Sequence, residues 1–252
     1  MNHMPYFDSL GDSNKSIIAN AIADSFGSDV NEAVNIRLKT FISRPFLSWD
    51  LLNTKIINSL DHEKFECHIS KRGYWKLLLI CDVQTGTIFS IMKDDRLTEI
   101  RNKNRKVPHY IDILASINSE LKAQNKQIAF NNFGRNKFDK SLLSEYLDKL
   151  VNGLSHQITT HAIITFSLHS GELTLINASI LDSALDIVYE EPWNQYIIRD
   201  YSHLLASNSS VIRQTDGIEM TLKPAAFEKK EKNTTKLKGE EQNNQKTNPN
   251  QK

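Results

Sequence analysis

Apolar residues are densest between Tyr74 and Met92, where two runs flank a short polar break. The first run extends from Leu77 to Cys81 without alternation, the second is Ile88–Met92, and Gly86 lies in the break. Short runs rich in β-branched and aromatic residues around a glycine-containing turn predict a β-hairpin. Because the first run does not alternate, we expect its strand to be central in a sheet and covered on both faces.

Three stretches ahead of this hairpin have helical spacing. Apolar residues recur every three or four positions over Ser13–Phe26, with Gly27 placed to end the helix. A second helix is predicted from Asp29 to Phe41 and is expected to end at Arg44-Pro45. A third helix is predicted over Ser48–Leu60. A strand at Phe65–Ser70 should follow these three helices.

The pattern after Met92 predicts two more helices and a second hairpin. Pro108 is placed as the first residue of a helix that continues to Leu121, and a further helix is predicted over Lys140–Asn152. Ala162–Leu168 and Leu173–Ile176 flank a turn and form the second predicted hairpin.

Residues 180–191 are ambiguous between helix and strand. The spacing of Leu181, Leu185 and Val188 favours a helix, on which Asp182, Asp186 and Glu190 would form one charged face. Residues 196–198 have the composition of a strand.

The C-terminal region has two parts. Asp216-Gly217, between apolar residues at 211–212 and 218–222, predicts a last hairpin. Beyond Phe227 the chain has almost no apolar residues, so residues 228–252 are expected to be disordered. The prediction is therefore a single α+β domain over 1–227, with a helical part at about 12–60 packed on a mostly antiparallel sheet built from hairpins in the mixed part at about 61–227.

Charge and cysteine content narrow the possible environments. The formal net charge is +1, and the tail from 228 to 252 is basic, so the rest of the chain is slightly acidic. The first twelve residues lack an apolar signal core, and no run approaches the roughly 18 apolar residues that a membrane span needs. Two cysteines and this N-terminus favour a cytoplasmic protein with reduced thiols and no membrane partner. The abundance of Lys, Asn and Ile suggests a bacterial or mobile-element gene.

Common catalytic and cofactor motifs are absent from the sequence. It has no phosphate-binding glycine loop, no Cys-x-x-Cys, no His-Glu-x-x-His and no Gly-x-Ser-x-Gly. We therefore expect a protein without a cofactor or metal, and the sequence favours a non-enzymatic role while leaving open an enzyme whose site is assembled from distant residues.

The best local signal is a basic segment between Arg96 and Tyr110. Its five cations are separated by one acid, Glu99, and by asparagines. Arginine and lysine contact phosphates through charge, while aromatic side chains stack on bases. The candidate nucleic-acid-binding residues are Arg96, Arg101, Lys103, Arg105, Lys106, His109 and Tyr110. The alternative interpretation is a solvated loop between a strand and a helix.

Two other functional hypotheses remain open. A protein–protein interaction or regulatory module, such as an immunity protein, would use an exposed sheet edge or the acidic face near 182–191. A divergent metal-dependent nuclease would use Asp82 and Lys93, but Ile91 stands where the acid-x-Lys triplet needs a carboxylate.

The remaining candidates are interpreted as structural. His156, His161 and His169 lie around the second hairpin without a completing ligand set, and Trp49, Trp75 and Trp193 are expected to be core anchors.

Overall fold

The computed structural model describes residues 6–34, 42–72, 75–122 and 138–197. The chain divides into two units, 1–199 and 200–252. The predicted hairpin around Asp216-Gly217 and the predicted disordered tail lie outside the described residues, and the account below concerns the first unit.

One six-stranded sheet runs through the middle of this unit, with its strands in sequence order. The strands are β1 (Phe65–Arg72), β2 (Trp75–Asp82), β3 (Thr87–Lys93), β4 (Thr160–His169), β5 (Glu172–Leu181) and β6 (Ile187–Pro192). Neighbours pair antiparallel except β3 and β4, which are parallel. The prediction of a helical N-terminus on a mostly antiparallel, hairpin-rich sheet is therefore confirmed.

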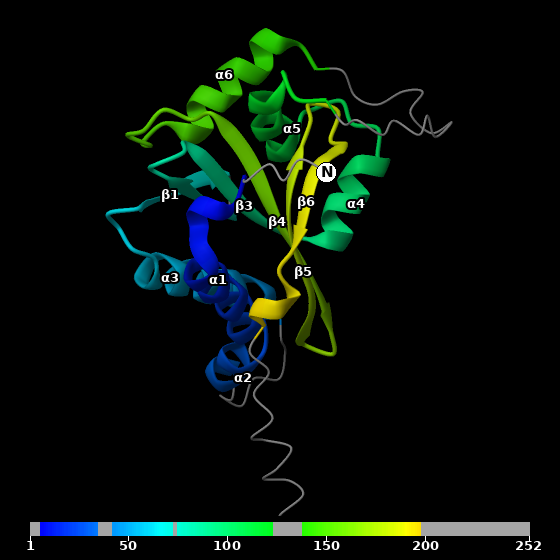
Figure 1. Cartoon of the computed structure of the whole chain (residues 1–252). Helices are drawn as coiled ribbons and strands as arrows, with labels where there is room; N and C mark the ends of the chain where they lie inside the picture. Colours follow the sequence, from blue (N-terminus) through cyan, green and yellow to red (C-terminus); the bar gives the residue numbers. More distant parts are fainter. Residues whose placement is uncertain (1–5, 35–41, 73–74, 123–137, 198–252) are drawn as a thin grey trace, which may run out of the picture. The chain divides into compact units, whose positions relative to one another are not determined.

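Helices cover both faces of the sheet (Figure 1). On one face lie α1 (Gly11–Phe26), α2 (Ser28–Val34) and α3 (Arg44–Ser59). On the other lie α4 (Asp94–Asn102), α5 (Tyr110–Ala115) and α6 (Lys140–Val151). Short 3-10 turns occupy η1 (Asp8–Leu10), η2 (Ser116–Asn118) and η4 (Asn194–Tyr196). No described helix is both long and apolar enough to cross a membrane.

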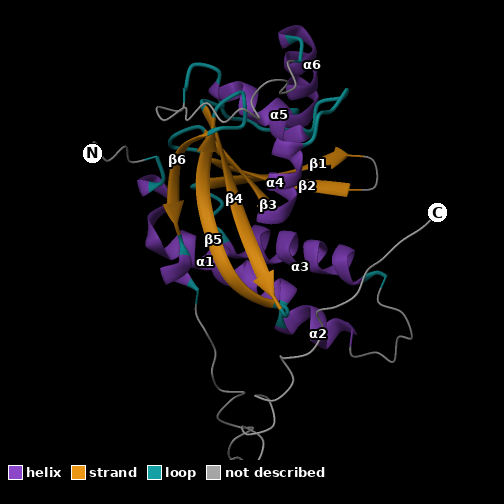
Figure 2. Cartoon of the chain, turned by 90° about the vertical axis from the view of Figure 1, so that its right-hand side faces the viewer, coloured by secondary structure: helices purple, strands orange, loops and turns teal. Residues whose placement is uncertain are grey.

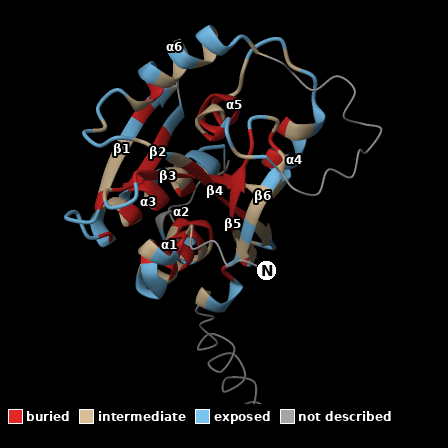
Figure 3. Cartoon of the chain, turned by 45° about the horizontal axis from the view of Figure 1, so that its top comes forward, coloured by how far each residue is buried: buried red, intermediate tan, exposed pale blue. Residues whose placement is uncertain are grey.

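The run Leu77–Cys81 is apolar throughout because each strand face packs on a separate core. Leu78 and Ile80 join the cluster under α1 and α3, while Leu77, Leu79 and Cys81 join the cluster under α4 and α5. Successive side chains of a strand point to opposite faces, so a strand between two helical layers has no polar positions. Figure 3 shows this buried band along the middle strands.

The hairpin of β2 and β3 separates along its length. The two strands are paired only from Ile80↔Phe89 to Asp82↔Thr87, next to the turn that holds Gly86. In contrast, β2 pairs with β1 over all eight residues, and β3 pairs with β4 over all seven. Figure 2 shows β1 and β2 diverging from β3 and β4. The sheet therefore splits at the end farthest from the β2–β3 turn.

Three predicted helix boundaries are wrong. The third helix starts at Arg44, not Ser48, because Pro45 occupies its first turn, where a missing N–H costs no hydrogen bond. Pro108 is not the first residue of α5, since His109 caps that helix. The helix also ends at Ala115, and a 3-10 turn continues it to Asn118.

The helix favoured for residues 180–191 does not form. β5 continues to Leu181, and β6 begins at Ile187 after a tight connection. Asp182 is buried at this turn, where its Oδ1 accepts hydrogen bonds from the backbone N–H groups of Ala184 and Asp186 at 2.8 and 2.9 Å. The predicted acidic helix face is therefore absent. Tyr196 belongs to the 3-10 turn η4 and not to a strand.

The tryptophans do not share one role. Trp193 is fully buried beside Phe7, in agreement with the prediction of a core anchor. Trp49 is half-buried against Phe26. Trp75 is 47% exposed, so the prediction that it anchors the core is wrong.

Candidate functional site: a pocket in the split of the sheet

A pocket of about 750 Å³ opens beyond the last paired residues of β2 and β3. Pockets of roughly 300–1,000 Å³ typically hold small ligands. The lining residues come from α3, β2, β3, α4 and the start of α5, and they are Trp49, Trp75, Lys76, Leu77, Ile91, Met92, Lys93, Asp95, Arg96, Glu99, His109 and Tyr110. Because Ile91 and Met92 face opposite cores, the pocket reaches both sides of the sheet.

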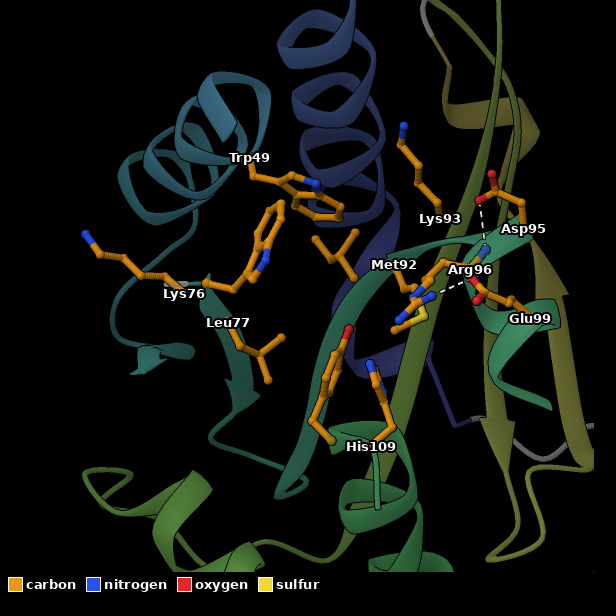
Figure 4. Close-up of a pocket in the computed structure, with 12 residues that line it drawn as sticks. Trp49, Lys76, Leu77, Met92, Lys93, Asp95, Arg96, Glu99 and His109 are labelled. Atoms are coloured by element: carbon orange, nitrogen blue, oxygen red, sulfur yellow. Dashed lines mark hydrogen bonds and ion pairs between the residues drawn. The ribbon is translucent and has the colours of Figure 1, made fainter. Parts of the chain in front are cut away.

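Aromatic side chains form one side of the pocket (Figure 4). Trp75 stacks on Phe46 of α3, with ring centroids 4.6 Å apart and planes 19° from parallel. The two rings remain 47% and 45% exposed. Trp49 is held edge-on by Phe26, at a centroid distance of 5.4 Å. The stacked pair thus fixes a flat, solvent-facing aromatic surface at the pocket.

Charged side chains form the other side and nearly balance one another. Lys93 ends β3, and its Nζ lies 5.3 Å from the centroid of the Phe26 ring. On α4, the Arg96 guanidinium pairs with Glu99, and the backbone N–H of Arg96 donates to Asp95 Oδ1 at 2.8 Å. With Lys76, the pocket carries three cations and two carboxylates. Its charge near neutral pH is therefore close to zero.

His109 is held in a defined orientation at the pocket. It caps α5: its Nδ1 accepts the backbone N–H of Ile111 at 3.4 Å, and its own N–H donates to Asp112 Oδ2 at 2.6 Å. Arg105 binds the same Asp112 carboxylate, with Nη2 to Oδ1 at 2.9 Å. Because Nδ1 accepts, the neutral imidazole carries its hydrogen on Nε2. The His109 ring lies beside the Tyr110 ring, with the centroids 4.4 Å apart.

The structure divides the seven residues predicted to bind nucleic acid. The first half of the basic segment is the helix α4, so only Lys103–His109 forms a loop. Arg96, His109 and Tyr110 line the pocket, and Lys103 and Lys106 are exposed on the loop between them.

The other two predicted residues hold the protein's own carboxylates. Arg105 is engaged with Asp112 and also donates to the Ile100 carbonyl at 3.2 Å. Arg101 lies 3.8 Å from Asp186. The structure therefore gives both arginines an intramolecular carboxylate partner.

Asp82 and Lys93 are too far apart to act together in one nuclease site. Asp82 pairs with Thr87 at the start of β3, and Lys93 lies six residues further along that strand, roughly 20 Å away. The Asp82 carboxylate accepts hydrogen bonds from the hydroxyls of Ser9 and Thr85, at 2.5 and 2.8 Å. Asp82 is therefore a turn-stabilising residue, and this geometry gives the nuclease hypothesis no site.

The three histidines lie in different environments. His156 contacts Glu66 at 2.8 Å, and His169 is exposed at the β4–β5 turn. His161 is fully buried, and its Nε2 lies 2.9 Å from Ser90 Oγ. Burial lowers the pKa of His161 to about 3, so the ring is neutral. Within the described ranges, no three histidine, cysteine or carboxylate side chains are grouped as metal ligands would be.

Both cysteines are poor nucleophiles in this fold. Cys81 is buried and Cys67 is half-buried, and burial raises the pKa of each thiol to about 11. The reactive form is the thiolate, which is scarce at neutral pH when the pKa is this high.

Sequence reasoning missed the wall of the pocket that comes from α3 and β2. Lys76 and Trp75 lie at the start of a strand chosen for its apolar centre. Trp49 lies on a helix predicted to serve the core, and Phe46 lies ahead of the predicted start of that helix. The available signal was the basic context of Trp75, which directly precedes Lys76 and is separated from Lys71-Arg72-Gly73 only by Tyr74.

The fold and the pocket define an α+β protein in which a mostly antiparallel sheet opens between two strands to form a site lined by aromatic and charged side chains. One family model matches residues 8–239, which is most of the chain. The protein therefore belongs to DUF5986, a family of unknown function. No curated protein and no solved structure matches the chain.

Proposed function

We propose that this protein binds nucleic acid and that its role is non-enzymatic. The observation that carries the proposal is the continuity of the cationic surface with the aromatic pocket. The loop Lys103–His109 runs from the end of α4 back to the pocket, so its exposed lysines flank a site that already contains Arg96 and Tyr110. Cations beside exposed aromatic rings are the common composition of nucleic-acid-binding grooves.

The phosphate contacts belong to a subset of the basic residues. Lys76, Lys103 and Lys106 are exposed, so a phosphate in solvent can reach them. The Arg96–Glu99 pair is about half exposed, so a phosphate can compete with Glu99 at low cost. Arg105 supports His109 through Asp112 and is not part of this surface.

Fluorescence anisotropy with labelled DNA and RNA tests the proposal. We expect binding that weakens steeply between about 50 and 200 mM salt, as phosphate contacts release counterions. The double variant Lys103→Glu/Lys106→Glu should lower affinity at least about tenfold and reduce the salt slope by about 1.4 for single strands.

The matched control is a double variant with the same change of charge at two lysines outside the pocket. Lys64 directly precedes β1, and its carbonyl accepts at 3.0 Å the N–H of Val83, which follows the end of β2 remote from the pocket; Lys140 begins α6. Lys64→Glu/Lys140→Glu should therefore leave affinity and slope close to wild type. Equal losses in the two double variants, or no salt-dependent binding by the wild type, would overturn the proposal.

A further inference from the structure

We infer that the pocket takes a single unpaired base, so that the protein selects single-stranded over double-stranded nucleic acid. This inference rests on the proposed function and names its substrate class. It starts from the split between β2 and β3, which leaves the Phe46–Trp75 stack at the edge of a cavity and not on a flat surface.

The floor of the cavity suits a base better than a phosphate. Leu77, Ile91 and Met92 lie at the bottom and are 8%, 5% and 4% exposed. A phosphate in contact with these side chains would lose its hydration without gaining a polar partner, which is costly in free energy. The flat face of a base is weakly hydrated, so its transfer into the cavity costs much less. The apolar floor therefore excludes the backbone of the nucleic acid and admits the ring.

The distribution of charge supports the same orientation. Asp95 and Glu99 offset two of the three cations in the pocket, so the cavity has little net attraction for an anion. Lys103 and Lys106 lie outside it on the loop. A strand whose phosphates follow the loop can place one base between the walls while its backbone stays in solvent.

Duplex DNA cannot use this cavity without losing a base pair. A paired base exposes only its edges in the grooves, and extrusion of a base costs a few kcal/mol of stacking and pairing. For a base in a single strand, the free-energy cost of entering the cavity is much smaller, because it has no pairing partner to leave. Stacking on one aromatic side chain corresponds to roughly 5–150-fold in affinity, which sets the scale of the expected preference.

The decisive variant is Trp75→Ala, because Trp75 is half exposed and its removal leaves no buried cavity. Tyr146→Ala is the matched control, since this aromatic residue is half-buried on α6, outside the pocket. Each protein is titrated with a labelled 20-nucleotide single strand and with a hairpin duplex of the same length, at several salt concentrations. Thermal melts confirm that both variants fold.

We expect the wild type to bind the single strand at least about tenfold more tightly than the duplex. Trp75→Ala should lower single-strand affinity by about tenfold with an unchanged salt slope and leave duplex affinity unaltered, whereas Tyr146→Ala should change neither. Binding of both substrates with equal affinity, unaffected by Trp75→Ala but weakened by Lys103→Glu/Lys106→Glu, would overturn the single-base inference and leave the proposed function standing. Absence of salt-dependent binding to either substrate would overturn both.

Discussion

At the scale of single residues, a buried amide side chain ties two neighbouring strands of the sheet together. Asn118 donates from Nδ2 to the carbonyls of His161 and Leu181, at 2.8 and 2.7 Å, and accepts the His161 N–H at 2.9 Å. One side chain thus satisfies backbone groups on β4 and β5. The neighbouring His161 is held neutral in the same layer, and its charge state links stability to pH.

His161 should make the folded protein less stable in mild acid. Burial lowers the pKa of His161 from 6.5 to about 3. Below pH 6.5, His161 therefore binds a proton in the unfolded chain but not in the folded chain, so the free energy of unfolding falls as the pH decreases towards 3. Above pH 6.5, His161 is neutral in both states and the effect vanishes. Between pH 7 and pH 5, the wild type should lose about 2 kcal/mol more of its free energy of unfolding than His161→Gln.

Urea denaturation at several pH values measures this difference. His169→Gln is the control, because His169 is exposed at the β4–β5 turn and should keep the wild-type dependence. Parallel pH profiles for the wild type and His161→Gln would contradict the prediction.

At the scale of elements, the turn between β2 and β3 depends on a glycine. Gly86 has φ +70°, and a Cβ placed there would lie 2.4 Å from the backbone oxygen of Gln157. The Gly86 carbonyl accepts the Thr159 N–H at 2.9 Å, and this hydrogen bond joins the turn to the segment that precedes β4. The residue therefore needs both a left-handed backbone and the absence of a side chain.

Gly86→Ala should destabilise the fold more than the same change at Gly171. Gly171 also has positive φ, +88°, but a Cβ there would have its nearest neighbour at 3.9 Å. Gly171→Ala should therefore cost only the backbone strain, about 1–2 kcal/mol. Gly86→Ala should cost about 2 kcal/mol more from the clash, measured as the change in free energy of unfolding. Similar losses for the two variants would show that the clash is relieved elsewhere.

Sequence patterns predicted the elements well where local chemistry determines them. The two hairpins were predicted because their apolar runs flank turns at Gly86 and Gly171, where both glycines have positive φ. Residues 182–186 were missed because Leu185 adopts φ +64°, which its leucine side chain gives no reason to expect. Pro45 was assigned to the end of one helix, although the same residue type is equally suited to begin the next.

The pocket was predictable only in part, because its two sides come from distant segments. The basic residues and aromatic residues at 96–110 form a local pattern, and Arg96, His109 and Tyr110 are indeed brought together. Trp75 reaches them only through the divergence of β2 from β3, which depends on tertiary packing. In the sequence, Arg105 has the charge and the basic neighbours expected of a phosphate ligand. Its pairing with Asp112 is visible only in the fold.

At the scale of the whole described unit, an ion pair joins its first helix to its last strand. Lys15 of α1 contacts Glu191 of β6 at 2.7 Å, and their side chains are 6% and 20% exposed. Trp193 Nε1 donates to the same carboxylate at 3.0 Å. The helical segment is thereby fixed to the sheet by a charge pair largely shielded from solvent.

Lys15→Met should lower the free energy of unfolding by about 3 kcal/mol. The substitution keeps most of the aliphatic stem but leaves the Glu191 carboxylate without its cation in a poorly solvated position. Lys149→Ala is the control, because the Lys149–Glu145 pair is 65% and 61% exposed and should contribute no more than about 0.5 kcal/mol. Chemical denaturation measures both free energies of unfolding. If Lys15→Met lowers this free energy as little as the control does, the Glu191 carboxylate becomes hydrated when Lys15 is removed, and the prediction is wrong.

The parallel pairing of β3 with β4 also has a consequence for how the chain reaches its native state. Strands β1 to β3 and strands β4 to β6 each form a contiguous antiparallel meander, and residues 94–159 separate the two. Each meander can assemble from contacts close in sequence. The β3–β4 junction instead brings together two strands separated by the whole intervening segment, which carries α4, α5 and α6. Docking of two preformed meanders is therefore the expected slow step of folding, and destabilising changes at the β3–β4 junction should slow folding more than changes within either meander.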